Sequence, residues 1–252
     1  MPGNEREIIK FLVINKNKIN LKHIGALNSI KVPHNNNLIE VNESNIYNFF
    51  SDDSHKKADA YLNNIGVSLK QIGGNFSYNR LQRKNISNFF GKFFLKNKAK
   101  KVILNIDKKI LQMHEGKIKR NFKFLEVMSN IEFKNILYFL MFVGSPNQGV
   151  TKFKPKFILE TKKKIDTIND IYVYTFDEFF NKYKDKISFA IRRHWIGQKS
   201  KSENKRAITI YNNKGNKKWC FNNIRGNPRS GWDDKISEKN RRTVYTLSIE
   251  QK

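Results

Sequence analysis

The segment from Ala58 to Lys70 constrains the fold more than any other part of the chain. It holds two short stretches of strand character, 58–62 and 66–70, separated by the turn residues Asn63-Asn64 and bounded by Gly66. Asparagine and glycine tolerate the positive φ angles that tight hairpin turns require. The segment is therefore predicted to form an antiparallel hairpin.

The two arms of this hairpin sort their side chains onto two faces, because side chains alternate along a strand. Ser68 and Lys70 fall on one face of the second arm, and Val67 and Leu69 fall on the opposite, core-facing side. Adjacent strands lie ~4.8 Å apart, so Asp59 on the first arm can face the same point as Lys70. The polar face thus collects an acid, a hydroxyl and an ammonium.

This set of groups suits metal-assisted hydrolysis of a phosphodiester. A carboxylate holds Mg²⁺, the metal lowers the pKa of a bound water, and a lysine stabilises charge that grows on the phosphate. The alternative is an ordinary cross-strand ion pair of Asp59 and Lys70 at the surface, worth at most about 1 kcal/mol.

The stretch KADAYL (57–62) followed by GVSLKQ (66–71) resembles the core of type II restriction endonucleases of the PD-(D/E)xK nuclease superfamily. The resemblance implies an α/β fold, a restriction-endonuclease-like core with a central mixed β-sheet flanked by helices. It also implies roles for Asp59 as metal-binding aspartate, for Ser68 in the catalytic tripeptide, for Lys70 as catalytic lysine and for the backbone carbonyl of Leu69 as a further Mg²⁺ ligand.

Two positions depart from the family pattern. Ala58 stands where a proline is common, and Ser68 stands where the tripeptide begins with an acid. Some family members with serine there take the missing carboxylate from the following helix, but residues 78–88 contain no acid, and Gln82 is the nearest polar candidate. The alternatives for the second carboxylate lie upstream and are Glu40, Glu43, Asp52 and Asp53. The source of this carboxylate and the number of metals stay open.

The resemblance further implies a sequence-specific endonuclease that cuts double-stranded DNA and leaves 5′-phosphates. It implies a homodimer on a palindromic site and a partner DNA methyltransferase. We expect a single endonuclease domain over residues 1–252, with a catalytic core at about 50–180 and a basic target-recognition region at about 185–252.

The charge of the chain supports a polyanionic partner. Its formal net charge is +27, from 49 Lys and Arg against 22 Asp and Glu, and residues 1–90 hold only 12 of the former and 7 of the latter. Arginine and asparagine read guanine and adenine edges bidentately, so the basic loop near residue 225 is a candidate for target recognition. The alternative is that this loop is solvated, with Trp195 and Trp232 as core anchors. The candidate DNA-contacting residues are Gln71, Arg80, Gln82, Arg83, Arg192, Arg193, Arg225, Asn227 and Arg229.

Other functions are open or disfavoured. The charge also fits a non-catalytic DNA- or RNA-binding module, or a repair or RNA-processing nuclease of the same fold. The single cysteine, Cys220, excludes an internal disulfide and a cysteine-based zinc site. The five histidines are scattered, and His114 with Glu115 is expected at an exposed helix end.

The remaining patterns predict a mixed α/β chain. The longest apolar run, 136–143, has eight residues against the ~20 needed to span a bilayer, and no signal-peptide pattern is present, so a soluble cytoplasmic protein is expected. The expected helices are 77–95, 102–113, 121–133 and 177–183, and 5–14 fits a helix or a strand. The expected further strands are 136–143, 171–174, 207–211, 218–222 and 243–249.

Overall fold

The computed structural model describes residues 5–46, 56–74 and 76–251. The chain divides into two compact units that are interleaved in sequence. Unit 1 comprises residues 1–76, 137–186 and 251–252, and unit 2 comprises residues 77–136 and 187–250. The range of about 50–180 expected for a catalytic core therefore contributes to both units. No helix in these described stretches has the length and apolarity to cross a bilayer.

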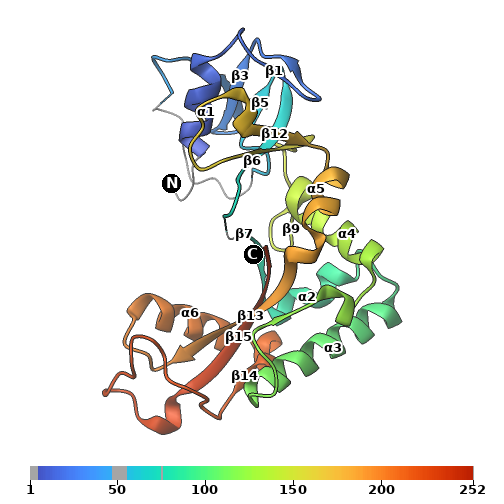
Figure 1. Cartoon of the computed structure of the whole chain (residues 1–252). Coiled ribbons are helices and arrows are strands. Elements are labelled where there is room, and N and C mark those ends of the chain that lie inside the picture. Colours follow the sequence, from blue (N-terminus) through green and yellow to red (C-terminus); the bar gives the residue numbers. More distant parts are fainter. Residues whose placement is uncertain (1–4, 47–55, 75, 252) are drawn as a thin grey trace. The chain divides into compact units, whose positions relative to one another are not determined.

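Unit 1 is built on a mixed six-stranded sheet with the order β12-β11-β6-β5-β3-β4 (Figure 1). Strand β11 runs parallel to β6, and the other neighbouring strands are antiparallel. The expected mixed α/β class with a central mixed sheet is confirmed at this level. The strands are β3 Ile30–His34, β4 Asn37–Glu40, β5 Ala60–Leu62, β6 Ile65–Gln71, β11 Phe157–Thr161 and β12 Ile171–Tyr174.

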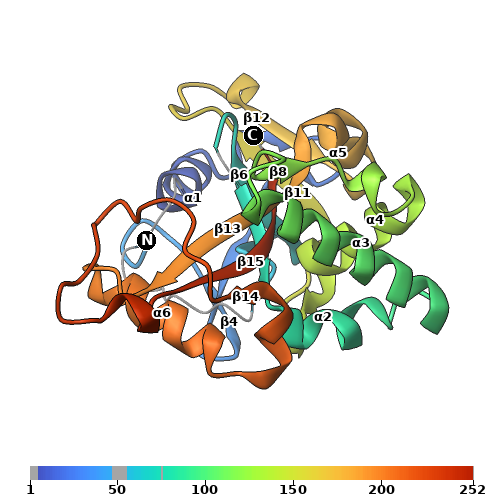
Figure 2. The same ribbon diagram turned by 90° about the horizontal axis from the view of Figure 1, so that it is seen from below.

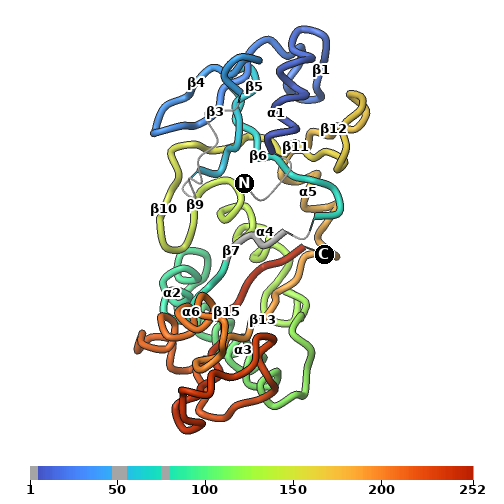
Figure 3. The backbone as a smooth tube through the Cα atoms, turned by 90° about the vertical axis from the view of Figure 1, so that its left-hand side faces the viewer, coloured from blue at the N-terminus to red at the C-terminus, as the bar shows by residue number. Residues whose placement is uncertain are grey.

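The predicted hairpin is formed by β5 and β6, which run side by side in Figure 3. Ala60 pairs with Val67, and the connecting Asn63 and Asn64 have φ angles of 49° and 63°. Both asparagines therefore occupy the left-handed region, as a tight hairpin turn requires. A Cβ on Gly66 would lie 2.3 Å from the Lys154 carbonyl oxygen, so a side chain does not fit there.

Helix α1, Glu5–Ile14, covers the apolar face of this sheet. Ile8, Ile9 and Leu12 follow helical spacing and are buried in the same core as Val67 and Leu69. The ambiguous segment 5–14 is thus a helix. Helix α5, Phe176–Tyr183, contacts β11 and β12 and begins at a Thr175 capping box, which confirms the predicted strand and helix at 171–183.

Unit 2 contains a second sheet with the order β14-β15-β13-β8, and β7 also pairs with β15. Helix α6 packs on β13, and Trp219 and Tyr245 are fully buried. Figure 2 shows β13 and β15 side by side. The elements of unit 2 are β7 Phe76–Leu81, α2 Arg83–Phe90, α3 Lys96–His114, β8 Asn121–Phe122, β13 Ile187–Ile196, α6 Lys201–Tyr211, β14 Cys220–Phe221 and β15 Arg242–Gln251.

Short elements complete the two units. They are β1 Asn20–Leu21, β2 Gly25–Ala26, α4 Asn130–Tyr138, a π-helical turn Phe139–Val143, β9 Gly144–Ser145, β10 Gly149–Val150 and the 3₁₀ turns Phe124–Glu126, Ile168–Asp170, Lys184–Lys186, Lys214–Trp219 and Glu238–Asn240.

Several predicted elements are wrong. The expected helix 77–95 is confirmed only over α2, Arg83–Phe90, and its first part is strand β7, because pairing with β15 outweighs the helical spacing of the apolar residues there. The expected strand 136–143 continues α4 into a π-helical turn, and the expected strand 207–211 is the end of α6, where Ala207 and Ile210 face the core. The expected helix 121–133 is divided between β8, a 3₁₀ turn and the start of α4. The helix at 102–113 and the strand at 243–249 are confirmed as parts of α3 and β15, and the expected strand at 218–222 is reduced to β14.

Candidate active site on the β5–β6 hairpin

Asp59 precedes β5 and is tied to the neighbouring strand. Its Oδ2 accepts a hydrogen bond from the backbone N–H of Leu69 at 2.7 Å and one from Ser68 Oγ at 3.2 Å. Among the described residues, no donor is bonded to its Oδ1. The carboxylate is therefore fixed by two donors and keeps one oxygen for a ligand.

Ser68 and Lys70 lie on the same face of β6, as predicted from the strand period. The Lys70 ammonium donates to the carbonyl oxygen of Leu69 at 3.1 Å, and the Leu69 side chain is buried in the apolar core. The structure thus brings together Asp59, Ser68, Lys70 and the Leu69 backbone. Since Asp59 bonds to Ser68 and Leu69, the arrangement is not the simple cross-strand ion pair considered above.

Glu5, at the start of α1, adds a second carboxylate that sequence reasoning missed. Burial raises its pKa, and the negative charge of Asp59 raises it further, while Lys70 and Lys56 oppose this shift. Lys57 responds to the same cluster, since burial and the charge of Lys70 lower its pKa. No sequence signal links residues 5 and 59, because the charge of Asp59 affects Glu5 only through the folding of α1 onto the sheet.

The carboxylates proposed from sequence lie elsewhere or are not described. Glu40 is on β4, two strands away from β5, at 3.6 Å from Lys16. Glu43 is exposed, and Asp52 and Asp53 fall outside the described residues. Gln82 belongs to unit 2, where its Oε1 accepts a hydrogen bond from Asn216 at 3.3 Å.

Glu160 is a further buried acid in unit 1, on β11 in register with Lys70. It is fully buried, and its two oxygens accept hydrogen bonds from the Tyr183 hydroxyl at 2.7 and 2.6 Å. Lys182 lies 3.1 Å from the same carboxylate. Burial and the Glu160 hydrogen bond raise the pKa of Tyr183 to about 12. For Lys182, burial opposes the charged form, but hydrogen bonds with Tyr174, Tyr183 and Glu160 outweigh it and raise the pKa.

The hairpin residues could offer a magnesium ion only oxygen ligands. In the described part of the chain, no group of three or more His, Cys, Asp and Glu side chains could hold a metal. Mg²⁺ is commonly held by one or two carboxylates together with water and substrate phosphate. Asp59 and Glu5 carry carboxylate oxygens, and the Leu69 carbonyl, which also accepts from the Lys70 ammonium, is a further oxygen. A cation nearby would offset the charge of Asp59, which adds to the effect of burial in raising the pKa of Glu5.

All six candidate DNA-contacting arginines lie in unit 2, and the first three to be considered have different surroundings. Arg80 on β7 is largely exposed, and the partial burial of its guanidinium, together with the charges of Arg206 and Arg192, lowers its pKa. Arg192 is held 2.5 Å from Glu250. Arg83 is largely buried and paired with Asp107 at 3.0 Å, so this ion pair helps to hold the fold of unit 2.

The remaining candidates for DNA contact also differ in their exposure. Gln71, in unit 1, is half-buried at the end of β6. Arg225, Asn227 and Arg229 are exposed in unit 2, whereas the guanidinium of Arg193 is turned toward the rings of Trp195 and Tyr245.

Two expectations about unit 2 need correction or refinement. His114 is buried and hydrogen-bonded to the Tyr245 hydroxyl at 2.8 Å, so the expectation of an exposed helix end is wrong. Its stacking on Phe221 at 4.1 Å explains why this helix terminus is covered. Trp195 and Trp232 are half-buried, and the fully buried tryptophan is Trp219.

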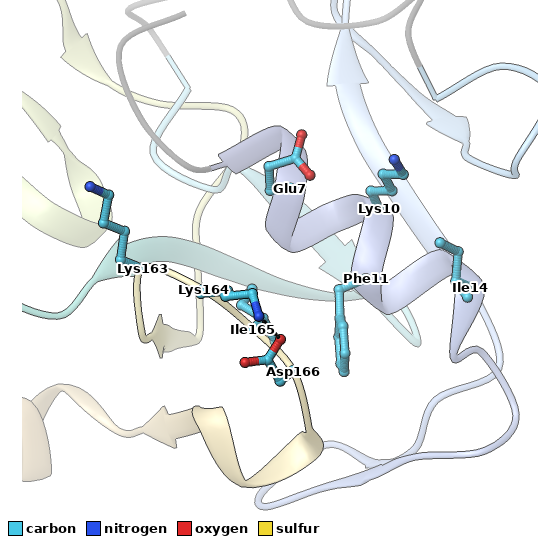
Figure 4. A pocket seen from close by; sticks show the side chains of 8 residues that line it. All are labelled: Glu7, Lys10, Phe11, Ile14, Lys163, Lys164, Ile165 and Asp166. Atoms are coloured by element: carbon cyan, nitrogen blue, oxygen red, sulfur yellow. Dashed lines mark ion pairs between the residues drawn. The ribbon is translucent and has the colours of Figure 1, made fainter.

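A separate hollow of about 290 Å³ lies in unit 1 between α1 and the turn at 163–166 (Figure 4). It is lined by Glu7, Lys10, Phe11, Ile14, Lys163, Lys164, Ile165 and Asp166, and it contains none of the hairpin residues. The hollow is therefore distinct from the Asp59, Ser68 and Lys70 cluster. Comparison of the chain with protein-family models, with curated proteins and with solved structures finds no match.

Proposed function

We propose that this chain is a Mg²⁺-dependent endonuclease that cuts double-stranded DNA at specific sites, in the manner of type II restriction enzymes. The observation that carries the proposal is the Asp59 carboxylate, fixed by Leu69 N–H and Ser68 Oγ beside the Lys70 ammonium. The mixed sheet of unit 1, with α1 on its apolar face, is consistent with the restriction-endonuclease-like core that the hairpin motif implies.

Each residue of the site has a distinct task in this proposal. Asp59, with Glu5 and the Leu69 carbonyl, would hold Mg²⁺, which supplies an activated water and charge neutralisation at the scissile phosphate. Lys70 stabilises the negative charge that develops on the phosphate oxygens. Ser68 and the Leu69 N–H orient the Asp59 carboxylate through its Oδ2. Glu5 would supply the second carboxylate, which the family pattern places at the position of Ser68.

The rest of the proposal concerns the substrate. A net charge of +27 favours a polyanion, and phosphate contacts supply most non-specific affinity for DNA. Two-fold symmetry would match a palindromic site, because each subunit would cut one strand. The homodimer, the 5′-phosphate ends and the partner methyltransferase rest on the motif resemblance alone.

The decisive experiment is incubation of the purified protein with plasmid DNA, with Mg²⁺ or with EDTA. We expect discrete fragments that require Mg²⁺ and carry 5′-phosphates. Smeared products would indicate a general nuclease of the repair or RNA-processing kind. A mobility shift without cutting would contradict the enzyme and favour the second candidate, a basic DNA- or RNA-binding module, which the charge alone supports equally well.

A further inference from the structure

Arginine and lysine are distributed differently over the two units. Ten of the eleven arginines, all except Arg6, belong to unit 2, whereas lysines occur throughout both units. A lysine is sufficient as a point charge on a phosphate, whereas the planar guanidinium of arginine presents a two-pronged donor that matches the N7 and O6 acceptors of guanine. Arg83, Arg120, Arg192 and Arg206 are held in ion pairs within unit 2, so the candidates for base recognition lie among its other arginines.

Within unit 2, the loop 225–231 is held in one conformation by its own contacts. The N–H of Gly231 donates to the Pro228 carbonyl at 2.9 Å, and the Gly231 carbonyl accepts from Lys199 N–H at 2.9 Å. The Trp232 indole N–H donates to Asn227 Oδ1 at 3.1 Å, and Pro228 is buried. A loop that is already ordered loses little conformational entropy when it binds.

Arg193 anchors the first residues of this loop. Its Nη1 donates to the Arg225 carbonyl at 2.7 Å, and its guanidinium lies 5.7 Å from the Trp195 ring and 6.0 Å from the Tyr245 ring. Gly226 follows with a φ of 73°, and a Cβ there would be 3.0 Å from Arg193 Nη1. Arg193 is therefore directed into the unit and positions the loop.

The anchored loop leaves two guanidinium groups at the surface. Arg229 is exposed and makes no hydrogen bond or ion pair with any residue that the structure describes. Arg225 is exposed too, with a single long bond of 3.4 Å to the Glu115 carbonyl. Asn227 differs, because its Oδ1 already accepts from Trp232, and reading adenine requires both ends of the amide.

We propose that the loop 225–231 is a preorganised DNA-recognition loop that recognises guanine in the major groove through Arg229 and Arg225. Arg193 and Asn227 are its positioning residues and do not contact bases. Guanine presents two acceptors, N7 and O6, that match the two-pronged guanidinium donor. This inference rests on the proposed DNA-cutting function and narrows its substrate to sites that contain guanine.

The chemical test removes one guanine acceptor. The same DNA is prepared by amplification with dGTP or with 7-deaza-dGTP, which lacks N7, and both products are used in binding and cleavage assays. We expect wild-type specific binding and cleavage to fall about tenfold or more on the 7-deazaguanine DNA. Arg229→Ala and Arg225→Ala should bind unmodified DNA more weakly and lose most of this discrimination. Lys235→Ala removes an exposed charge outside the loop and should keep the discrimination of the wild type.

The positioning role is tested with Arg193→Lys, which keeps the charge but loses the planar guanidinium. We expect non-specific DNA affinity to be unchanged and specific binding to fall several-fold, with faster amide exchange in residues 225–231. Cutting that is indifferent to 7-deazaguanine, or discrimination that survives in both arginine variants, would overturn this inference and leave the proposed function intact. A wild-type protein that neither binds nor cuts the unmodified DNA would overturn both.

Discussion

The backbone N–H of Leu69 donates a hydrogen bond to Asp59 Oδ2 at 2.7 Å, across the two arms of the β5–β6 hairpin. A side chain here takes the place of a backbone acceptor at the end of the strand ladder. Asp59 therefore has a structural task besides the chemical one proposed for it, and substitutions must separate the two.

Asp59→Asn is the informative substitution for the chemistry. The amide oxygen can still accept from Leu69 N–H, so the hairpin should stay folded, but the negative charge that would hold Mg²⁺ is lost. We expect Mg²⁺-dependent cutting to fall by about 10²–10³ or more, with DNA binding retained. Lys70→Met should give the same result. Cutting at the wild-type rate in both variants, measured on plasmid DNA, would refute the assignment.

Glu5→Gln should separate stability from activity. The raised pKa of Glu5 means that its ionised form is disfavoured in the folded protein, so the cost is present above the raised pKa and absent below the ordinary glutamate range. We expect Glu5→Gln to raise the temperature of unfolding at neutral pH by a few degrees, to lose that gain near pH 4, and to reduce cutting.

Glu7→Gln is the matched control on the same helix, since Glu7 is exposed. It should change neither the unfolding temperature nor the cutting rate. Full cutting activity in Glu5→Gln would remove Glu5 from the metal site and leave the second carboxylate to be found elsewhere.

Tyr183→Phe should destabilise unit 1. The substitution removes the hydroxyl that donates to the buried Glu160 carboxylate, and an acceptor left without its donor costs about 1–3 kcal/mol. The free energy of unfolding from urea denaturation measures the loss. Tyr172→Phe is the control, because Tyr172 is exposed and its hydroxyl is not hydrogen-bonded to any described residue; equal stabilities of the two variants would contradict this account.

Gly66→Ala should disrupt the hairpin from its outer side. The added Cβ would lie 2.3 Å from the Lys154 carbonyl oxygen, and this backbone contact has no flexible side chain that could yield. We expect a loss of more than about 2 kcal/mol in the free energy of unfolding. Asn64→Gly, at a neighbouring turn position with a φ of 63°, should stay close to wild type, and a harmless Gly66→Ala would mean that the 154–156 segment moves aside easily.

Local sequence patterns predicted the hairpin, but they did not point to Glu5, the proposed second carboxylate. Alternation in Val67, Ser68, Leu69 and Lys70 decides which side chains share a face, and Asn63-Asn64 decides where the chain turns. These are effects between residues close in sequence. Glu5 reaches Asp59 only through tertiary packing, which no spacing in the sequence encodes.

The errors in unit 2 have a related cause. Residues 76–81 are a strand because β15, more than 160 positions later, pairs with them, and this overrides the helical spacing of their apolar residues. Residues 207–211 look like a strand in isolation but complete α6, whose buried face is defined by Ala207 and Ile210 against β13. In both places the deciding partner is distant in sequence.

The interleaving of the two units has a consequence for how this protein could be divided or recombined. The chain passes from one unit to the other after residues 76, 136, 186 and 250, so no single cut yields an intact unit. Removing everything after residue 186 would take β13 and most of β15 from unit 2 and leave α2 and α3 without the turn Lys214–Trp219, which both helices contact. Transfer of unit 2 to another scaffold would therefore require two separate inserts, grafted together.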